Sequence, residues 1–455
     1  MLGKGCEALH FKTNGLRSFP KQLLDLLHSF TELQPADIAD ILQQMEEMDR
    51  AKLFIRLDGE TAALVLRRLN TEAVESLLHI LDPERIAAVL DEMSLDDAAD
   101  FLGEVSENVK TELLDLMEVE EASDVKELLA YPEDTAGGIM TTEYVAILED
   151  ISAEKAIQVL RETAPDAETV YYVYVINTKN QLVGVISLRE LIIANPETLI
   201  TDIMQKKVIS VRVDTDQEEV ARVVTRYDFL AVPVIDHDRS LVGIVTVDDV
   251  IDVIHEEATE DIYRLAGAQQ VEEDLPLPER LVASVRSRLP WLLVTLMGGM
   301  LAGQVLRGLE TELSRMVALA FFIPLLTGMG GNVGTQSSTL TVRGLATGQI
   351  EGREVILTVL KESLVGMSIG AVCGLIVGTV AFLWQGNMAL GLVVGLALLG
   401  NMTTAATMGT LVPLFFRRVG IDPAVASAPF ISTSIDITGL LIYSILASAL
   451  ISYLV

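Results

Sequence analysis

Asp436 is a carboxylate deep inside a long apolar stretch, residues 425–455, where the local sequence reads Ser434-Ile-Asp-Ile-Thr-Gly. A charged side chain in mid-span costs about 2.5–3.5 kcal/mol on membrane-insertion scales, so it usually faces an ion path or a partner. No Lys or Arg stands in mid-span in the later apolar stretches, and their one other acid, Glu362, has Lys361 beside it near a span start. We therefore predict that Asp436 faces an ion path; pairing with a buried cation is the alternative.

A second apolar stretch carries amides and several glycines, in the sequence Gly330-Gly-Asn-Val-Gly-Thr-Gln. Helix-breaking residues and amides at membrane depth are tolerated where they pack inside protein or line water. Glycines let backbone carbonyls approach an ion, and Asn332 offers a side-chain oxygen. Small-residue helix packing would explain the glycines but not the amides. We predict that Gly331 and Asn332 act with Asp436 in binding a hydrated ion.

Further carboxylates gather before the apolar stretches. Asp252, Glu256 and Glu260 recur at i, i+4 and i+8, and Glu257 and Asp261 repeat this spacing on a neighbouring face. Like charges at this spacing destabilise a helix, and a hard divalent cation such as Mg²⁺ or Ca²⁺ would relieve the repulsion. A solvated acidic surface is the alternative. The acids that we assign to a regulatory metal are Asp96, Asp100, Glu218, Asp228, Asp249, Asp252, Glu257, Glu260 and Asp261.

Charge is divided unevenly along the 455 residues, whose net charge is −32. Residues 281–455 hold nine Lys and Arg against seven Asp and Glu, so the first 280 residues hold 24 against 58. An acidic surface repels nucleic acid and attracts cations, which argues against a DNA or RNA partner. Only Cys6 and Cys373 are present, and residues 1–30 lack the apolar core of a signal peptide. We expect the acidic half to be cytosolic.

Patterning predicts a multidomain protein. Residues 1–130 read as an acidic all-α domain in which amphipathic helical phrases recur about every 24 residues, as in a superhelical solenoid. Residues 131–250 mix short β-branched strands with helices in two similar units, 131–200 and 201–250. An acidic connecting helix is expected over 251–283. Residues 284–455 contain five apolar spans, each long enough to cross a bilayer.

The two α+β units resemble a tandem pair of CBS domains. The resemblance rests on Leu182-Val-Gly-Val-Ile-Ser-Leu-Arg-Glu and Leu241-Val-Gly-Ile-Val-Thr-Val-Asp-Asp, each after an alternating strand. It implies a nucleotide cleft for a ligand such as ATP, in which a hydroxyl and an acid hold the ribose and aromatic rings hold the base. Some CBS pairs serve only as dimer spacers. The residues carried over to this cleft are Tyr172, Ser187, Arg189, Glu190 and Phe229, with Thr246 and Asp249 in the second unit.

Basic residues predict the orientation of the spans. Seven Lys and Arg fall on the side that includes the N-terminal half, and only Arg307 and Arg315 lie in the opposite loops. Because basic loops stay cytosolic, the N-terminus is expected inside the cell and the C-terminus outside. No Gly-x-x-x-x-Gly-Lys-Ser/Thr phosphate loop is present, so neither a nucleotide-driven pump nor another enzyme is expected.

Taken together, the chain resembles the MgtE family of magnesium channels over nearly its whole length. The specific phrases are Gly330-Gly-Asn-Val-Gly-Thr-Gln-Ser-Ser-Thr-Leu, Asp422-Pro-Ala and Ser434-Ile-Asp-Ile-Thr-Gly. Ala428 departs from the asparagine that better-known members carry before the next proline. The resemblance implies a homodimer in the cell (inner) membrane with the pore on its two-fold axis. It also implies Mg²⁺ entry down the electrochemical gradient and closure when cytosolic Mg²⁺ binds the acidic domains.

Two other functions stay open at the level of the sequence. One is an ion-coupled exchanger for another divalent cation such as Co²⁺. The other is a membrane-anchored sensor of divalent cations or nucleotides without transport. Amides at membrane depth and Asp436 argue against a sensor alone, since neither is needed for anchoring.

Overall fold

The computed structural model describes residues 33–163, 167–269, 277–350, 354–426 and 428–450. The chain forms two compact units, 1–251 and 252–455. Cys6, the N-terminal segment examined for a signal peptide and the last residues of the fifth predicted span lie outside the described residues.

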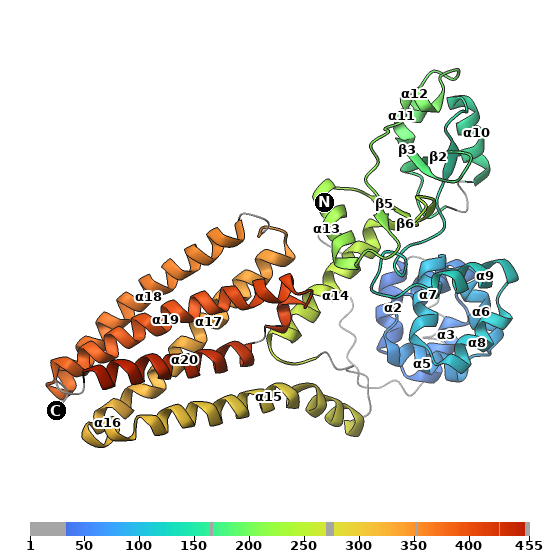
Figure 1. Ribbon diagram of the computed structural model, residues 1–455. Coiled ribbons are helices and arrows are strands. Elements are labelled where there is room, and N and C mark those ends of the chain that lie inside the picture. The colour runs from blue at the N-terminus through green and yellow to red at the C-terminus, as the bar shows by residue number, and fades with distance from the viewer. Residues whose placement is uncertain (1–32, 164–166, 270–276, 351–353, 427, 451–455) are drawn as a thin grey trace, which may run out of the picture. The chain divides into compact units, whose positions relative to one another are not determined.

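Residues 33–129 form a solenoid of eight short helices (Figure 1). Their starting residues are 12 apart throughout, so a hairpin of two helices repeats every 24 residues, as the sequence predicts. Alternate helices pack on one another, which buries an apolar stripe on each. The helices are α2 (Pro35–Gln43), α3 (Glu47–Phe54), α4 (Gly59–Leu66), α5 (Thr71–Ile80), α6 (Pro83–Leu90), α7 (Leu95–Glu104), α8 (Glu107–Leu116) and α9 (Val119–Leu128).

Two small sheets with the same topology follow, as expected for a CBS pair. In the first, β1 (Ala146–Leu148) pairs in parallel with β2 (Tyr172–Ile176), which pairs antiparallel with β3 (Leu182–Ser187). In the second, β4 (Val211–Arg212), β5 (Ala231–Ile235) and β6 (Leu241–Thr246) repeat this order, and both sheets shift register at the end of the middle strand. The helices of this region are α10 (Ala153–Thr163), α11 (Leu188–Ile193), α12 (Ile200–Ile203) and α13 (Gln217–Tyr227).

The glycine shared by the two CBS phrases has a packing role. A Cβ on Gly184 would lie 2.4 Å from the sulfur of Met204, and one on Gly243 would lie 2.6 Å from the sulfur of Met140. In each sheet, therefore, a methionine side chain packs against the third strand at its glycine, where the strand has no side chain. The repeated phrase reflects this shared packing as well as any ligand role.

The connecting segment differs from the single helix predicted over 251–283. Helix α14 (Val247–Leu265) ends before Gly267, whose φ of 70° is left-handed, and a new helix, α15 (Leu277–Gly308), begins beyond it. A glycine just past a helix end is the usual terminating residue, because it adopts this conformation without strain. The regular spacing of acidic residues continues only to Asp261. The end of this spacing therefore lies closer to the observed end of α14 at Leu265 than the predicted end at residue 283 does.

Unit two contains five helical stretches that are long and apolar enough to cross a membrane, as predicted. Span two is an unbroken helix despite its glycines, preceded by the 3₁₀ helix η2 (Val317–Phe322). The remaining elements are α16 (Glu310–Arg315), α17 (Ile323–Ala346), α18 (Glu354–Gln385), α19 (Met388–Arg418), η3 (Pro423–Val425) and α20 (Ala428–Ala449).

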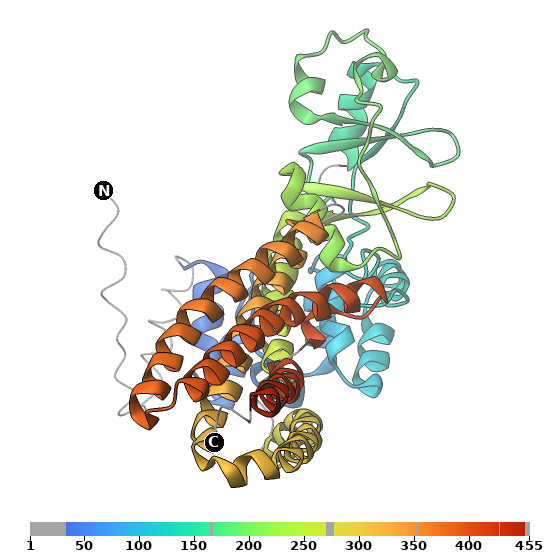
Figure 2. The same cartoon turned by 60° about the vertical axis from the view of Figure 1, so that its left-hand side comes forward.

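Helices α17, α19 and α20 form the core of unit two, and α18 lies alongside α19 (Figures 1 and 2). Glycines allow these helices to approach closely: Cβ atoms on Gly374 and Gly378 would lie 2.5 and 2.7 Å from backbone oxygens of α19. Helix α15 packs on α20 and leaves most of its apolar surface uncovered within the chain. Lipid or a second subunit must cover that surface.

Two polar contacts group the loops of unit two. Arg417 donates from Nη1 to the carbonyl of Ile350 at 3.2 Å, which joins the end of α19 to the connection between α17 and α18. Ser448 donates to Oε1 of Glu312 at 2.6 Å, which joins the end of α20 to α16. The first contact thus brings Arg417 to the connection between α17 and α18.

Candidate functional site

A cavity of about 530 Å³ opens among the membrane-spanning helices, and all three predicted pore residues line it. Gly331 and Asn332 reach it from α17, and Asp436 reaches it from α20. Hydroxyl groups supply much of the remaining polar lining, from Thr295, Thr327, Thr335 and Ser432. Residues that lie a hundred positions apart in the sequence thus line one space.

The Asp436 carboxylate is half-buried in this cavity. Within the described part of the chain it forms no hydrogen bond and no ion pair. Pairing with a buried cation, the alternative considered from the sequence, therefore has no support among the described residues. An unneutralised acid at this depth costs free energy that a bound cation would recover.

Glu362 behaves differently from Asp436. Ser337 of α17 donates a hydrogen bond to its Oε2 at 2.8 Å. This contact joins α17 to α18 and gives Glu362 a neutral partner inside the protein. Of the two acids in the later spans, only Asp436 is left facing the cavity.

The turn that follows α14 lies beside the cavity. Ala266 lines it, and a Cβ on Gly267 would lie 2.8 Å from Cγ of Pro429. Close by, Arg264 forms ion pairs with Glu260 and with Asp422, which precedes η3. Ala428 also lines the cavity, where it presents a methyl group in place of an amide. The carboxylates of Glu260 and Asp422 thus both form ion pairs with Arg264.

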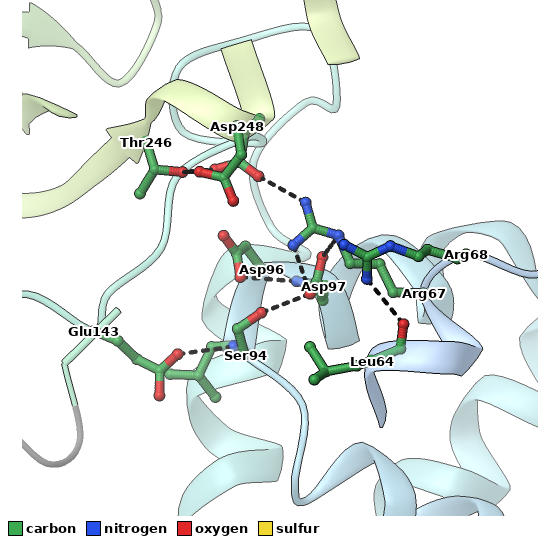
Figure 3. A network of polar contacts seen from close by, with 11 residues as sticks. Leu64, Arg67, Arg68, Ser94, Asp96, Asp97, Glu143, Thr246 and Asp248 are labelled. Carbon is green, nitrogen blue, oxygen red and sulfur yellow. Dashed lines mark hydrogen bonds and ion pairs between the residues drawn. The ribbon is translucent and has the colours of Figure 1, made fainter. Parts of the chain in front are cut away.

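A second concentration of acids lies in unit one, where the solenoid meets the second CBS domain (Figure 3). It includes three of the predicted regulatory acids, Asp96, Asp100 and Asp249. Asp96 is buried, with 7% of its surface exposed, and its carboxylate accepts a hydrogen bond from the amide of Asp97 at 2.9 Å. Thr246 donates to Asp248 at 2.6 Å and also contacts Asp249. Acids from α7 and from the start of α14 thus come together.

Burial, together with the charges of neighbouring acids, raises the pKa values of Asp100, Asp249 and Glu168. Burial, followed by the charges of Asp96 and Asp97, raises the pKa of Asp100 to about 7. Burial and Asp96 also raise the pKa of Asp249 to about 7, although the Thr246 hydroxyl acts in the opposite direction. Glu168, in the loop before β2, shows the same effect from burial, Asp96 and Glu143. The raised pKa values mean that ionising these three carboxyl groups costs free energy in their buried, acidic surroundings.

Arg67 is the cation at the centre of this cluster. Its Nε lies 2.9 Å and its Nη1 3.1 Å from the two carboxylate oxygens of Asp97, a bidentate geometry. Its Nη2 lies 3.4 Å from Oδ1 of Asp249. The neighbouring Arg68 instead donates to the carbonyl of Leu64 at 2.9 Å (Figure 3). Arg67 therefore ties the solenoid to the CBS pair.

The other predicted regulatory acids lie elsewhere. Glu218 pairs with Arg222 at 3.2 Å near the start of α13, and Asp228 ends that helix with a left-handed φ of 54°. Asp252, Glu257, Glu260 and Asp261 follow along α14 in unit two. Within the described ranges, no three His, Cys, Asp or Glu side chains converge closely enough to hold a metal ion directly.

The predicted nucleotide residues have internal partners. Ser187 and Glu190 form a capping box at the start of α11, with the Ser187 hydroxyl donating to Oε2 of Glu190 at 2.7 Å. The rings of Tyr172 and Phe229 meet edge to face, with centroids 6.5 Å apart, and Phe229 also stacks on Tyr227. Arg189 is exposed on α11. The aromatic residues of the two CBS units are thus adjacent, and their role in binding a base stays a prediction.

Sequence reasoning missed Arg67, Asp97 and Glu168 at the acidic cluster, and the hydroxyl residues of the cavity. Asp97 adjoins the predicted Asp96, so the pair of acids was a usable signal. Arg67 lies 182 residues from Asp249, and no local pattern indicates that contact.

Comparison with known proteins covers both units. The MgtE family model, described as a divalent cation transporter, matches residues 323–446, the MgtE intracellular N domain matches 33–134, and the CBS domain matches 136–197 and 200–256. The magnesium transporter MgtE of Thermus thermophilus is 46% identical over 340 residues, 74% of this chain and 75% of that protein. Its namesake in Enterococcus faecalis is 47% identical over 336 residues, 74% of this chain and 73% of that protein.

One solved structure is described as the soluble part of a magnesium transporter. It has 44% sequence identity, covers 52% of this chain and 93% of that chain, and gives a TM-score of 0.49. The extent of the matches to the curated transporters, together with the five spans and the cavity that contains Asp436, decides the classification. This chain is a multi-pass membrane protein that belongs to the MgtE family of divalent cation transporters.

Proposed function

We propose that the protein is a Mg²⁺ channel whose ion path runs through the cavity beside Asp436. The observation that carries the proposal is an acid at membrane depth that lacks a protein partner in the described residues and faces a hydroxyl-lined space. Mg²⁺ gives up its water reluctantly, so an ion that keeps its hydration shell suits a site with few carboxylates and many hydroxyls. The inside-negative potential would contribute about 2.3 kcal/mol per charge per 100 mV.

A second copy of the chain would complete the site. One chain supplies a single carboxylate to the cavity, and two chains related by a two-fold axis would supply a facing pair. The large uncovered surface of α15 is consistent with a subunit contact or with lipid. We therefore propose a homodimer in the cell (inner) membrane with the pore on its symmetry axis.

Orientation follows from the basic residues. Arg343 and Arg417 lie in the last turns of α17 and α19, and the contact from Arg417 to Ile350 joins these two helix ends. We propose from the positive-inside rule that this side is cytosolic, and that the acidic solenoid and the CBS pair lie in the cytosol as well. Mg²⁺ would then enter the cell and meet these domains after passage.

We further propose that cytosolic Mg²⁺ binding to the acidic cluster closes the channel. The donor set fits a hard divalent cation, because it consists of carboxylates, and burial and neighbouring acids raise the pKa values of Asp100 and Asp249 to about 7. Asp96, Asp100 and Asp249 would hold the ion, with water between ion and carboxylate where the acids do not converge. Neutralisation would favour the closed arrangement of solenoid and CBS pair, and several such sites could supply the about 5.5 kcal/mol that a full population switch requires.

A nucleotide such as ATP is the proposed ligand of the CBS pair. The adjacent rings of Tyr172 and Phe229 support a base-stacking site. The Ser187–Glu190 capping box would have to open for either group to hold a ribose. Calorimetric titration of the protein with ATP should show binding that the change Phe229→Ala weakens, and the absence of heat in the wild type would contradict this part of the proposal.

Mg²⁺ flux into liposomes that contain the purified protein tests the main proposal. Asp436→Ala should abolish the flux, whereas Glu310→Gln, which removes one exposed acid of α16, should leave it unchanged. Flux that needs a counter-ion gradient would favour the exchanger, and wild-type protein without flux would favour the sensor. Equal flux in Asp436→Ala and wild type would refute the role of Asp436.

Limited proteolysis tests the gating proposal separately. Cleavage between the solenoid and the CBS pair should slow as Mg²⁺ rises through the millimolar range. Asp249→Asn should require more Mg²⁺ for the same protection. Cleavage that is independent of Mg²⁺ would contradict closure by this cluster.

A further inference from the structure

Asn401 stands near the middle of α19, outside the cavity, and is fully buried. Its Nδ2 donates a hydrogen bond to the carbonyl of Leu326 on α17 at 2.7 Å. Its Oδ1 has no hydrogen-bond partner among the described residues. A buried amide that is only half satisfied is costly at membrane depth, where leucine would fill a similar volume without that cost. Packing alone therefore does not explain the residue.

Two glycines accommodate the Asn401 amide. A Cβ on Gly330 of α17 would lie 2.5 Å from Nδ2, and a Cβ on Gly439 of α20 would lie 2.5 Å from Oδ1. Any side chain at either position would displace the amide. Asn401 thus sits at the meeting point of three helices, and each face of its amide contacts a position that only glycine leaves open.

Both glycines are adjacent to the ion path. Gly330 immediately precedes Gly331 and Asn332, and Gly439 lies one helical turn beyond Asp436. Leu326, the hydrogen-bond acceptor, immediately precedes Thr327, which lines the cavity. The amide therefore lies where the Asn332 segment of α17 meets the Asp436 segment of α20, next to the direct contact between Gly330 and Ile435.

We infer that Asn401 is a positioning residue for the pore, which sets the separation of the Asn332 and Asp436 segments and hence the cation that fits between them. The inference rests on the proposed channel function. Ion selectivity should depend on it, because Mg²⁺ and Ca²⁺ differ in preferred coordination distance and in how readily they lose water. Asn401 itself contacts no ion in this account.

Flux measurements with Mg²⁺ and with Ca²⁺ test the inference on the full-length protein. Asn401→Leu should change the Mg²⁺/Ca²⁺ flux ratio at least fivefold and leave the thermal midpoint within a few degrees of wild type. The matched control is Thr410→Val. Thr410 is equally buried on α19, but its hydroxyl bonds within its own helix, to Ala406 at 3.0 Å, so its loss should leave the ratio unchanged.

Two outcomes would overturn the inference: an unchanged flux ratio in Asn401→Leu, or an equal loss of both fluxes with a lowered thermal midpoint. The second would show a packing role alone. Where Asn401→Leu does not fold, Asn401→Ala decides by the same ratio. Wild-type protein without Mg²⁺ flux would instead refute the channel proposal, and wild-type flux with wild-type selectivity in the variants would refute only the role of Asn401.

Discussion

The two acidic regions of this chain differ in what balances their charge. At the junction of the solenoid and the CBS pair, several carboxylates share one arginine, which bridges Asp97 and Asp249. In the membrane cavity, Asp436 has no such cation among the described residues. A site with its own cation can exist without Mg²⁺ and respond to its concentration. A site without one depends on the ion that passes, which suits conduction.

Placing an arginine in the cavity should remove this difference and have the largest effect. Thr335→Arg would put a permanently charged guanidinium in the space that Asp436 faces. We expect Mg²⁺ flux to fall at least a hundredfold, about 2.7 kcal/mol, because the arginine both pairs with Asp436 and repels the ion.

Thr335→Gln is the control for side-chain bulk, and its flux should fall less than tenfold. The comparison between the two regions would lose its basis if the arginine and glutamine variants conducted equally well.

Competition between protons and Mg²⁺ for the carboxylates of the acidic cluster should have the next largest effect. A carboxyl whose pKa is raised is penalised when ionised; the penalty is absent below its ordinary pKa and complete above the raised value. Asp100, with a pKa of about 7, is therefore mostly protonated at pH 6 and mostly ionised at pH 8. Each proton that Mg²⁺ must displace should weaken Mg²⁺ binding to the acidic cluster of unit one by about tenfold between pH 8 and pH 6.

Titration of the full-length protein with Mg²⁺, followed by protease protection at the two pH values, measures this effect. Without Mg²⁺, the same reasoning predicts more protection at pH 6 than at pH 8. An affinity for Mg²⁺ that rises on acidification would contradict the assignment of these acids.

Removing the native cation from the acidic cluster should have a smaller effect in the opposite direction. Arg67→Gln frees Asp97 and Asp249 and makes the cluster more negative, so half-maximal protection should need about three- to fivefold less Mg²⁺. Arg68→Gln is the matched control, because the Arg68 side chain contacts only the carbonyl of Leu64 in the contacts that the structure describes. Equal Mg²⁺ dependence in both variants would show that Arg67 does not compete with the ion.

Sequence periodicity predicted most of the fold. The 24-residue hairpin repeat, the duplicated strand order and the five spans all follow from local hydrophobic spacing, which is set within each element. The prediction of one continuous connecting helix was wrong. A long polar stretch does not by itself indicate where a helix ends, and the signal for the end was Gly267, a residue type that often terminates helices. Asp436 and Asn332 could be selected because polar groups in apolar spans are rare.

Tertiary partners were the part that sequence could not supply. Arg67 meets Asp249 only because the solenoid folds back on the CBS pair. Asn401 reads as one more polar residue in a span, and its significance depends on the two glycines that face it across different helices. Such contacts depend on helix rotation and crossing, which no single sequence pattern encodes.

The central claim is that one acidic region conducts and the other regulates, and a paired flux measurement tests it most directly. Asp436→Asn and Asp249→Asn each remove one charge, and Mg²⁺ flux can be recorded for both at micromolar and at millimolar Mg²⁺ on the cytosolic face. The account predicts that Asp436→Asn is silent at both concentrations, and that Asp249→Asn still conducts at the millimolar concentration that closes the wild type, because its closure requires more Mg²⁺. Closure of Asp249→Asn at the same Mg²⁺ concentration as wild type, or conduction by Asp436→Asn, would contradict it.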